Sequence, residues 1–235
     1  MSVQTATLAL VPRRMTDPRF RADQFAGVHA DAHIAPINAF VDAIRDRDGR
    51  GWVPYVAPMH GGVDARVLSI LRDPGPATQS DVGSGFVAVE NDDPTAERQA
   101  ILFAEVGLDP RSVLPWNAYP WYINAAPNAE QSQAGAEVLV ELLRLLPDLR
   151  VVLLQGRDAE AGWRRVERLR PGIADELQLS VLSTIHPGRQ ALFTPDPAER
   201  ARRVAHQEAT FRRVVATLDE TLPESPLEPG LESAP

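Results

Sequence analysis

Asp73 is the first residue whose type and setting could do chemistry. It directly follows an apolar run and stands before Pro74 and Gly75. Because proline restricts the residue before it to extended geometry, the carboxylate is held in a defined direction. A carboxylate there could orient a water molecule or stabilise a cation. An Asp-Pro-Gly turn without a chemical role is the commoner use of these residues, so both interpretations stay open at this point.

A glycine-rich segment follows, with Phe86 after Gly83 and Gly85. The glycines would let the backbone approach a ligand closely. Phe86 could stack on a flat ring or fill the core, and the core is the more frequent place for phenylalanine. The acidic Glu-Asn-Asp-Asp run at residues 90–93 could bind a divalent cation through its oxygen atoms. We favour the alternative, in which these acids cap a helix that begins near Thr95.

Two further polar residues each follow a β-like run. Asn117 stands among aromatic residues, and its amide offers the donor and acceptors that reading a base edge requires. It could equally cap the strand end. His186 precedes Pro187, which fixes the direction of the imidazole. Such an imidazole could donate a hydrogen bond to a developing anion, although a single histidine more often has a structural role.

Hydrophobic periodicity predicts the elements that must position these residues. Strands are predicted at residues 52–57, 67–71, 112–116, 151–154 and 179–185, and helices at 35–44, 95–106, 133–146, 159–169 and 197–218. Strands separated by helices indicate βαβ units. We therefore expect an α/β protein with three α/β/α layers and a central, mainly parallel four-stranded sheet. Ligands of such sheets bind beyond the carboxyl ends of the strands, where Asp73, Asn117 and His186 fall.

The composition is typical of a soluble globular protein, with 44% hydrophobic and 24% charged residues among 235. We expect one domain over residues 1–220 and a disordered, acidic, proline-rich tail over 221–235. The net charge of −8 counts against nucleic-acid binding through overall charge, though not against a local basic groove. The absence of cysteine excludes disulfides, thiolate catalysis and cysteine-held iron–sulfur clusters.

The amino-terminal segment differs from a signal peptide, because its arginines follow a short apolar patch instead of preceding a longer one. No run approaches the roughly 18–20 apolar residues that span a bilayer. We expect a cytoplasmic protein that does not bind membranes.

The order of the four segments resembles the uracil-DNA glycosylase superfamily over roughly residues 65–215. In that family an Asp-Pro-Tyr or Asn-Pro-Gly loop follows a strand, a ring-stacking Phe comes next, a base-reading Asn ends a later strand, and a His-Pro loop comes last. The matching segments are Asp73-Pro74-Gly75, Gly85-Phe86, Trp116-Asn117 and His186-Pro187. The strand before the last of them, at residues 151–156, also resembles the family's.

The resemblance implies a role for each matching residue. Asp73 would orient the water or stabilise the sugar cation, and Phe86 would stack on the base. Asn117 would read the uracil edge, and His186 would donate to a uracil oxygen as negative charge develops. The implied activity is hydrolysis of the N-glycosidic bond of uracil, or a related deaminated base, in DNA, with no metal or cofactor. We expect a monomer whose partner is DNA containing uracil or a mismatched base.

The chain departs from the family's most stringent uracil enzymes at three places. Leu71-Arg72 replaces Gly-Gln before the Asp, which alters backbone contacts to the base. Gly75 replaces a Tyr that blocks 5-methyl groups, so discrimination against thymine is expected to be weaker. Gly188-Arg189 replaces Ser-Pro, which leaves Arg189 or Gln190 as candidates for the wedge that replaces a flipped base.

Three other interpretations remain open. A base-binding protein could keep the pocket without efficient excision, or act on free nucleosides or RNA. A metal-dependent phosphohydrolase could use Asp73 and the acidic run at residues 90–93. The domain could also be purely structural. A set of arginines could contact phosphates or form a solvated helix face, namely Arg189, Arg200, Arg202 and Arg203.

Overall fold

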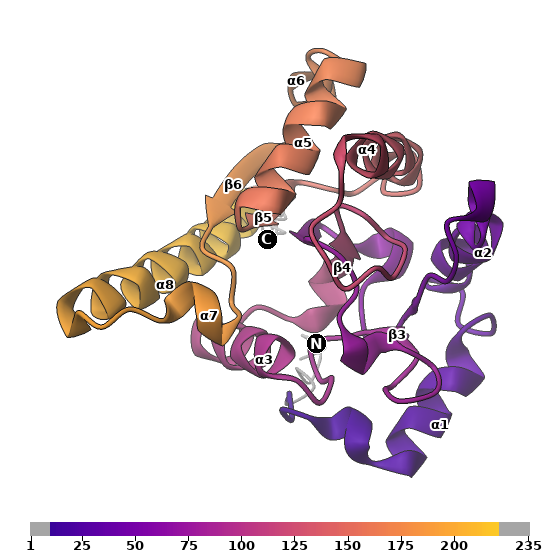
Figure 1. Cartoon of the computed structure of the whole chain (residues 1–235), viewed down its shortest axis with the longest axis horizontal. Helices are drawn as coiled ribbons and strands as arrows, with labels where there is room; N and C mark the ends of the chain where they lie inside the picture. Colours follow the sequence, from indigo (N-terminus) through magenta and orange to yellow (C-terminus); the bar gives the residue numbers. More distant parts are fainter. Residues whose placement is uncertain (1–9, 221–235) are drawn as a thin grey trace, which may run out of the picture.

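The computed structural model describes residues 10–220, and the tail expected at 221–235 lies outside them. A four-stranded sheet in the order β4-β2-β5-β6 forms the middle of three layers, and all its neighbouring strands are parallel (Figure 1). Its strands are β2 (Val67–Leu71), β4 (Val113–Asn117), β5 (Val151–Gln155) and β6 (Ser180–Thr184). The expected α/β/α fold with a central parallel sheet is confirmed.

Helices cover both faces of this sheet. One layer consists of α2 (Ala35–Ile44), α4 (Ala129–Leu143) and α5 (Arg157–Leu169), which share one apolar core with the strands. The opposite layer consists of α3 (Pro94–Val106) and the long α8 (Pro197–Glu220), which pack against each other. Shorter helices lie at the periphery, namely α1 (Pro18–Gly27), α6 (Ile173–Glu176) and α7 (Arg189–Leu192).

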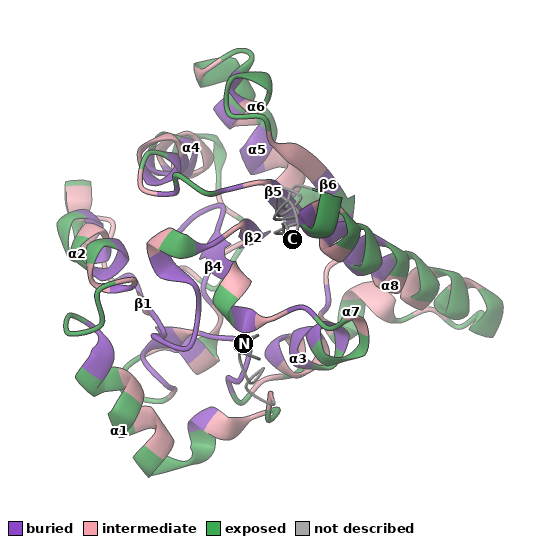
Figure 2. Ribbon diagram, turned by 180° about the vertical axis from the view of Figure 1, so that it is seen from behind, coloured by how far each residue is buried: buried purple, intermediate pink, exposed green. Residues whose placement is uncertain are grey.

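The central strands are apolar on both sides, because each has a helical layer on either face. In β5, Val152 and Leu154 join the core beneath α4 and α5, whereas Val151 and Leu153 join the core beneath α3 and α8. Successive side chains of a strand point to opposite faces, which produces this division. Buried residues therefore lie in the middle of the molecule, while the outer faces of the helices are exposed (Figure 2).

Local sequence signals fix the ends of the helices next to the site. Asp93 is the N-cap of α3, and its carboxylate accepts hydrogen bonds from the backbone N–H groups of Thr95 and Ala96. Pro94 follows at the first helical position, where the missing N–H costs nothing. Gly107 ends the helix in the left-handed conformation with φ of 73°.

A second, two-stranded parallel sheet was not expected from the sequence. It pairs β1 (Tyr55–Val56) with β3 (Phe86–Val87). The strand predicted at residues 52–57 thus shrinks to two residues. Helices α6 and α7 were also missed, because one turn is too short to show a hydrophobic period. The connecting 3₁₀ turns are Arg14–Thr16, Arg47–Gly49, Gly62–Asp64, Pro76–Thr78 and Pro110–Ser112.

Candidate functional site

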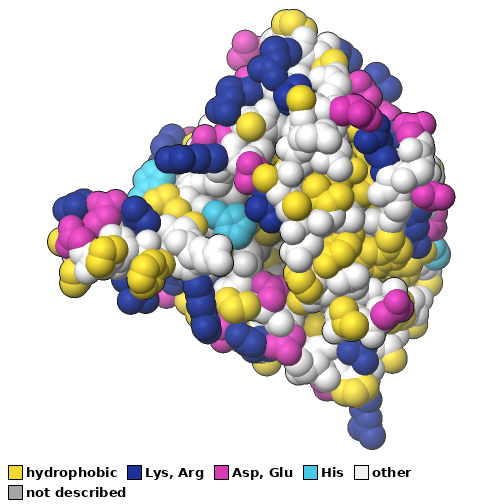
Figure 3. Space-filling model, in the orientation of Figure 1, with side chains coloured by type: hydrophobic (Ala, Val, Ile, Leu, Met, Phe, Trp, Pro, Cys, Tyr) yellow, Lys and Arg dark blue, Asp and Glu magenta, His cyan; other side chains and the backbone are white. Residues whose placement is uncertain are grey.

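A cavity of about 690 Å³ lies at the carboxyl end of the four-stranded sheet. Its walls come from the ends of β2, β4 and β5, from the amino-terminal turns of α3 and α5, and from the loop that carries α7. Figure 3 shows that this face of the molecule is hollowed, with a histidine and a basic side chain beside the hollow. Its lining includes Ser69, Arg72, Asp73, Gly75, Val87, Gln99, Asn117, Gln155, Arg157, His186, Arg189 and Gln190.

Asp73 lies at the edge of this cavity, two residues beyond the end of β2. Its side chain is only 4% exposed, and Oδ1 accepts a 2.5 Å hydrogen bond from Nε of Arg72. Its other oxygen, Oδ2, is buried and has no hydrogen-bond partner in the described part of the chain. One oxygen of the carboxylate is therefore fixed by its neighbour, and the second is left for another donor.

His186 enters the cavity from the loop after β6, and its protonation follows from its contacts. The backbone N–H of Gly188 donates to Nδ1 over 2.9 Å, so the proton of the neutral ring belongs on Nε2. Burial, and then the nearby positive charge of Arg72, lower the pKa of His186. The ring is therefore a neutral imidazole near pH 7 that carries an Nε2–H donor. Gly156 packs against it so closely that a Cβ there would stand 3.0 Å from Cβ of His186.

Asn117 is the last residue of β4 and lies beside Leu71 of β2 in the sheet register. It is buried and lines the cavity. Its side chain makes no hydrogen bond to another residue within 10–220. An amide that is unpaired at the wall of a cavity is available to a ligand or to water, as a donor and as an acceptor.

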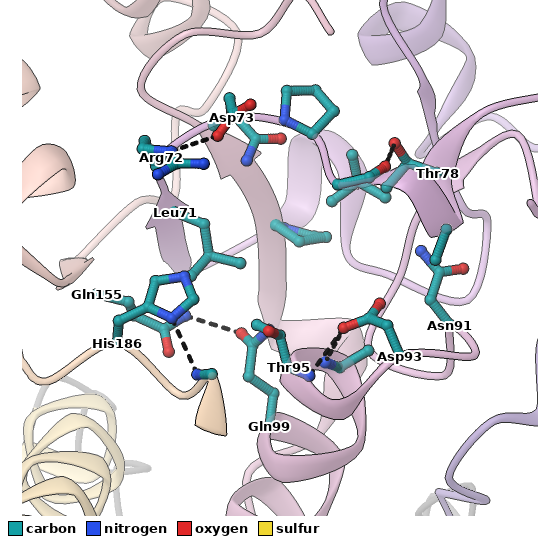
Figure 4. Close-up of a pocket in the computed structure, with 18 of the residues that line it drawn as sticks. Leu71, Arg72, Asp73, Thr78, Asn91, Asp93, Thr95, Gln99, Gln155 and His186 are labelled. Atoms are coloured by element: carbon teal, nitrogen blue, oxygen red, sulfur yellow. Dashed lines mark hydrogen bonds and ion pairs between the residues drawn. The ribbon is translucent and has the colours of Figure 1, made fainter. Parts of the chain in front are cut away.

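Sequence reasoning missed a chain of buried polar groups that lines the same cavity. Nε2 of Gln155 donates to Oγ of Ser69 over 2.7 Å and to Oε1 of Gln99 over 2.8 Å (Figure 4). Oε1 of Gln155 is buried without a partner among the described residues. The signal was present for Gln155, because a polar residue ends an otherwise apolar strand. Gln99 gave no such signal, since one glutamine in an amphipathic helix is unremarkable.

Phe86 does not lie in the cavity, contrary to the stacking role expected for it. Its side chain is fully buried in the core beneath α3 and α8, and its ring centroid is 4.5 Å from that of Phe25. The reason is strand geometry, because Val87 faces the cavity and its neighbour in β3 must face the opposite way. No Phe, Trp or Tyr among residues 10–220 lines the cavity.

The acidic run at residues 90–93 is occupied by structural contacts. Asp93 caps α3, Asp92 pairs with Arg13, and Glu90 accepts from the backbone N–H of Val11. Burial raises the pKa of both Asp93 and Glu90. Over residues 10–220, no group of three or more His, Asp or Glu side chains is arranged to hold a metal ion. The capping interpretation is confirmed for Asp93, whereas Glu90 and Asp92 make other structural contacts.

Of the remaining predicted residues, Arg200 is exposed on α8 and does not line the cavity, and the others divide into two groups. Gly75, Arg189 and Gln190 line the cavity, and a Cβ on Gly75 would meet no atom within 4 Å. Arg202 and Arg203 instead pair with Glu199 on their own helix. The second of these arginines also donates to the carbonyl groups of residues 191 and 193, which joins α8 to α7. These two arginines stabilise the local structure.

No family model matches the chain, and no curated protein matches it either. Every helix within residues 10–220 is too short or too polar to cross a bilayer. The fold and the site together define a three-layer α/β/α protein with a ligand-sized cavity at the carboxyl end of its sheet.

Proposed function

We propose that the protein is a metal-independent glycosylase that hydrolyses the N-glycosidic bond of uracil, or of a related deaminated base, in DNA. The observation that carries the proposal is the meeting of Asp73, Asn117 and His186 in one cavity. These residues lie at or just beyond the carboxyl ends of three different strands and are separated by tens of residues in the sequence. Each presents the group that the reaction needs, namely a carboxylate, an amide and a neutral imidazole N–H.

The reaction begins with a nucleotide flipped out of the DNA, because a base inside a duplex cannot reach the cavity. Asn117 distinguishes uracil from cytosine, which present different donors and acceptors. The C1′–N1 bond then breaks and its electron pair goes to the base, which leaves an oxocarbenium-like sugar. Asp73 stabilises this cation and receives a proton from the water that adds to C1′. His186 donates its Nε2–H to the oxygen on which the base becomes negative.

The rim of the cavity supports a nucleic-acid substrate. Arg157 and Arg189 line the cavity and are exposed to solvent. Exposed arginines at the mouth can pair with phosphates and release counterions, which makes binding dependent on salt. The net charge of −8 therefore does not prevent contact with DNA at this one face.

Two observations favour a second candidate, a protein that binds nucleobases without excising them efficiently. No aromatic ring within residues 10–220 lines the cavity, so the stacking that is typically worth about 1–3 kcal/mol per base is missing. In addition, one oxygen of Asp73 is already paired with Arg72. The missing ring lowers the binding energy that could offset the cost of flipping the base, and the pairing of Asp73 with Arg72 reduces its power to stabilise the sugar cation.

The deciding experiment measures excision from end-labelled oligonucleotides that carry U·G, U·A, T·G or single-stranded U, in buffer with EDTA. Abasic products are cut with alkali and resolved on a gel. Wild-type protein runs beside Asp73→Asn and His186→Ala, each of which removes one of the proposed groups. Loss of one preorganised donor is expected to slow the chemical step about 100-fold or more.

Arg164→Gln serves as the matched control, because Arg164 is an exposed residue on α5 outside the cavity lining. Cleavage at uracil by wild type and control, but not by the two site variants, would support the glycosylase. Folded wild-type protein that binds uracil-containing DNA without cleaving it would favour the binding protein. Cleavage that appears only in a parallel reaction with Mg²⁺ and without EDTA would contradict both proposals.

A further inference from the structure

Arg72 occupies a position in the site that the proposed mechanism does not use. It lies between the end of β2 and Asp73, and its side chain is 36% exposed whereas that of Asp73 is 4% exposed. Its Nε is bound to the buried carboxylate, as Figure 4 shows. Its two Nη groups make no hydrogen bond to another residue within 10–220. Arg72 is thus anchored at Nε and keeps a fork of free donors in the lining of the cavity.

The cavity lining holds a second donor besides Arg72, namely the neutral ring of His186. Its Nε2–H can pair with an anion but brings no positive charge of its own. The charged groups around it are Arg72, Asp73 and Asp158, and of these Arg72 favours the neutral ring whereas the two carboxylates oppose it. A fixed cation next to a neutral donor is a suitable pair for binding a negative group, because the guanidinium supplies positive charge and the imidazole supplies an N–H.

We propose that Arg72 stabilises the departing base as an anion, together with the Nε2–H of His186. This inference rests on the proposed glycosylase function and adds a residue to it. The electron pair of the broken C1′–N1 bond is delocalised over the base, and the free Nη groups pair with that charge. The base later takes up a proton from solvent, and Asp73 returns to solvent the proton that it received from water.

Arg72 fits this role better than the other arginines of the cavity. Arg157 and Arg189 are exposed and start helices at the rim, and neither guanidinium makes a hydrogen bond or ion pair with another residue within 10–220. The anchor on Asp73 orders Arg72 before the ligand arrives, which lowers the entropy lost on binding. In this arrangement the carboxylate of Asp73 acts on the sugar cation, and the guanidinium of Arg72 acts on the base anion.

The test compares Arg72→Gln and Arg72→Lys with wild type in single-turnover excision of uracil and of 5-fluorouracil. Fluorine withdraws electrons, so the 5-fluorouracil anion needs less help from the protein. Arg72→Gln should slow uracil excision about 100-fold and 5-fluorouracil excision clearly less. Arg72→Lys should recover part of the loss, because it keeps the charge without the planar fork. Arg164→Gln controls for the loss of one positive charge.

An equal loss for both bases would overturn the inference while leaving the glycosylase intact. Binding of free 5-nitrouracil, which is an anion near neutral pH, gives a readout that needs no catalysis. By calorimetry, wild type should prefer this anion to neutral uracil, and Arg72→Gln should lose the preference. If wild type excises neither base, the proposed function fails, and the binding of 5-nitrouracil then decides whether Arg72 forms an anion site. Unchanged binding in a folded Arg72→Gln protein would then overturn the anion site as well.

Discussion

The four-stranded and the two-stranded sheets use their buried side chains differently. The sequence predicts that one residue now found in each sheet contacts the base, namely Asn117 in β4 and Phe86 in β3. Both residues are buried, but Asn117 lines the cavity at a strand's carboxyl end whereas Phe86 packs in the core. The difference shows that the face and end of the sheet on which a side chain lies decide its role. An aromatic ring that faces the core stabilises the fold and cannot reach a ligand in the cavity.

The strongest way to break this comparison is Phe86→Ala. Removing a fully buried ring is expected to lower the free energy of unfolding by about 3–5 kcal/mol. Urea denaturation followed by circular dichroism measures the loss. Phe193→Ala is the control, because that side chain is 76% exposed and its loss should change stability little. A stable Phe86→Ala protein that had lost ligand binding would show that the ring stacks on a base after all.

Two histidines allow the core and the cavity to be compared by the pH dependence of stability, His60 in the core and His186 at the cavity. Burial lowers the pKa of the fully buried His60 to about 3 from the usual 6.5. The unfolded chain therefore takes up a proton near pH 6.5 and the folded protein only near pH 3, so stability falls as the pH drops through this window. The slope from this one group is about 1.4 kcal/mol per pH unit.

Denaturation midpoints between pH 3 and pH 7 should therefore change less steeply for His60→Gln than for wild type. The carboxylates are common to both proteins, so their contributions cancel in the difference. His186 also has a lowered pKa, and His186→Gln provides the partner measurement at the edge of the cavity. An unchanged slope in His60→Gln would mean that His60 is accessible to protons in the folded state.

Two buried asparagines sharpen the comparison further. Asn91 donates to the carbonyl of Phe86 over 2.8 Å and accepts from Oγ of Ser84 over 2.6 Å. Asn91→Leu removes both of these buried hydrogen bonds and should cost about 1–3 kcal/mol of stability. Asn117→Leu should leave stability nearly unchanged and instead reduce the preference for uracil over cytosine by about 1–3 kcal/mol.

Urea denaturation and competition binding with the free bases separate these two effects. Loss of stability in Asn117→Leu, with the base preference kept, would assign Asn117 to the fold instead of the site.

The smallest effect is expected at Gly75. Its φ of −82° suits any residue, and an added Cβ would meet no atom within 4 Å. Gly75→Ala should therefore raise stability by up to about 1 kcal/mol, because the unfolded chain loses freedom. Gly83→Ala is the contrast, since its Cβ would stand 2.2 Å from the carbonyl oxygen of Ala77 and must destabilise the loop. Thermal denaturation of the two variants should shift in opposite directions.

Gly75→Tyr then tests the cavity itself. A ring at this open position would narrow the cavity, so binding of thymine should weaken more than binding of uracil. Equal weakening of both bases would show that position 75 does not face the 5-position of the ring.

Much of the fold follows from local sequence patterns. The strand predicted at residues 67–71 and the helix predicted at 35–44 have the same bounds in the structure. Long apolar runs and amphipathic stripes carry their own signal, because burial on one or both faces imposes the period. The helix α1 lacked such a stripe, and β3 is two residues long, so neither could be read from periodicity.

The sequence by itself determined the order of strands and helices, and therefore that Asp73, Asn117 and His186 come at strand ends. Prolines and apolar periods act over a few residues, which is why such features can be read locally. Only the tertiary structure decided that Phe86 faces the core, that Gln155 meets Gln99, and that Arg72 is anchored on Asp73. The first two depend on sheet register and on the packing of distant layers, which no local pattern encodes. The third joins neighbours in the sequence, but it forms because the loop after β2 buries the carboxylate of Asp73 beside the half-exposed Arg72.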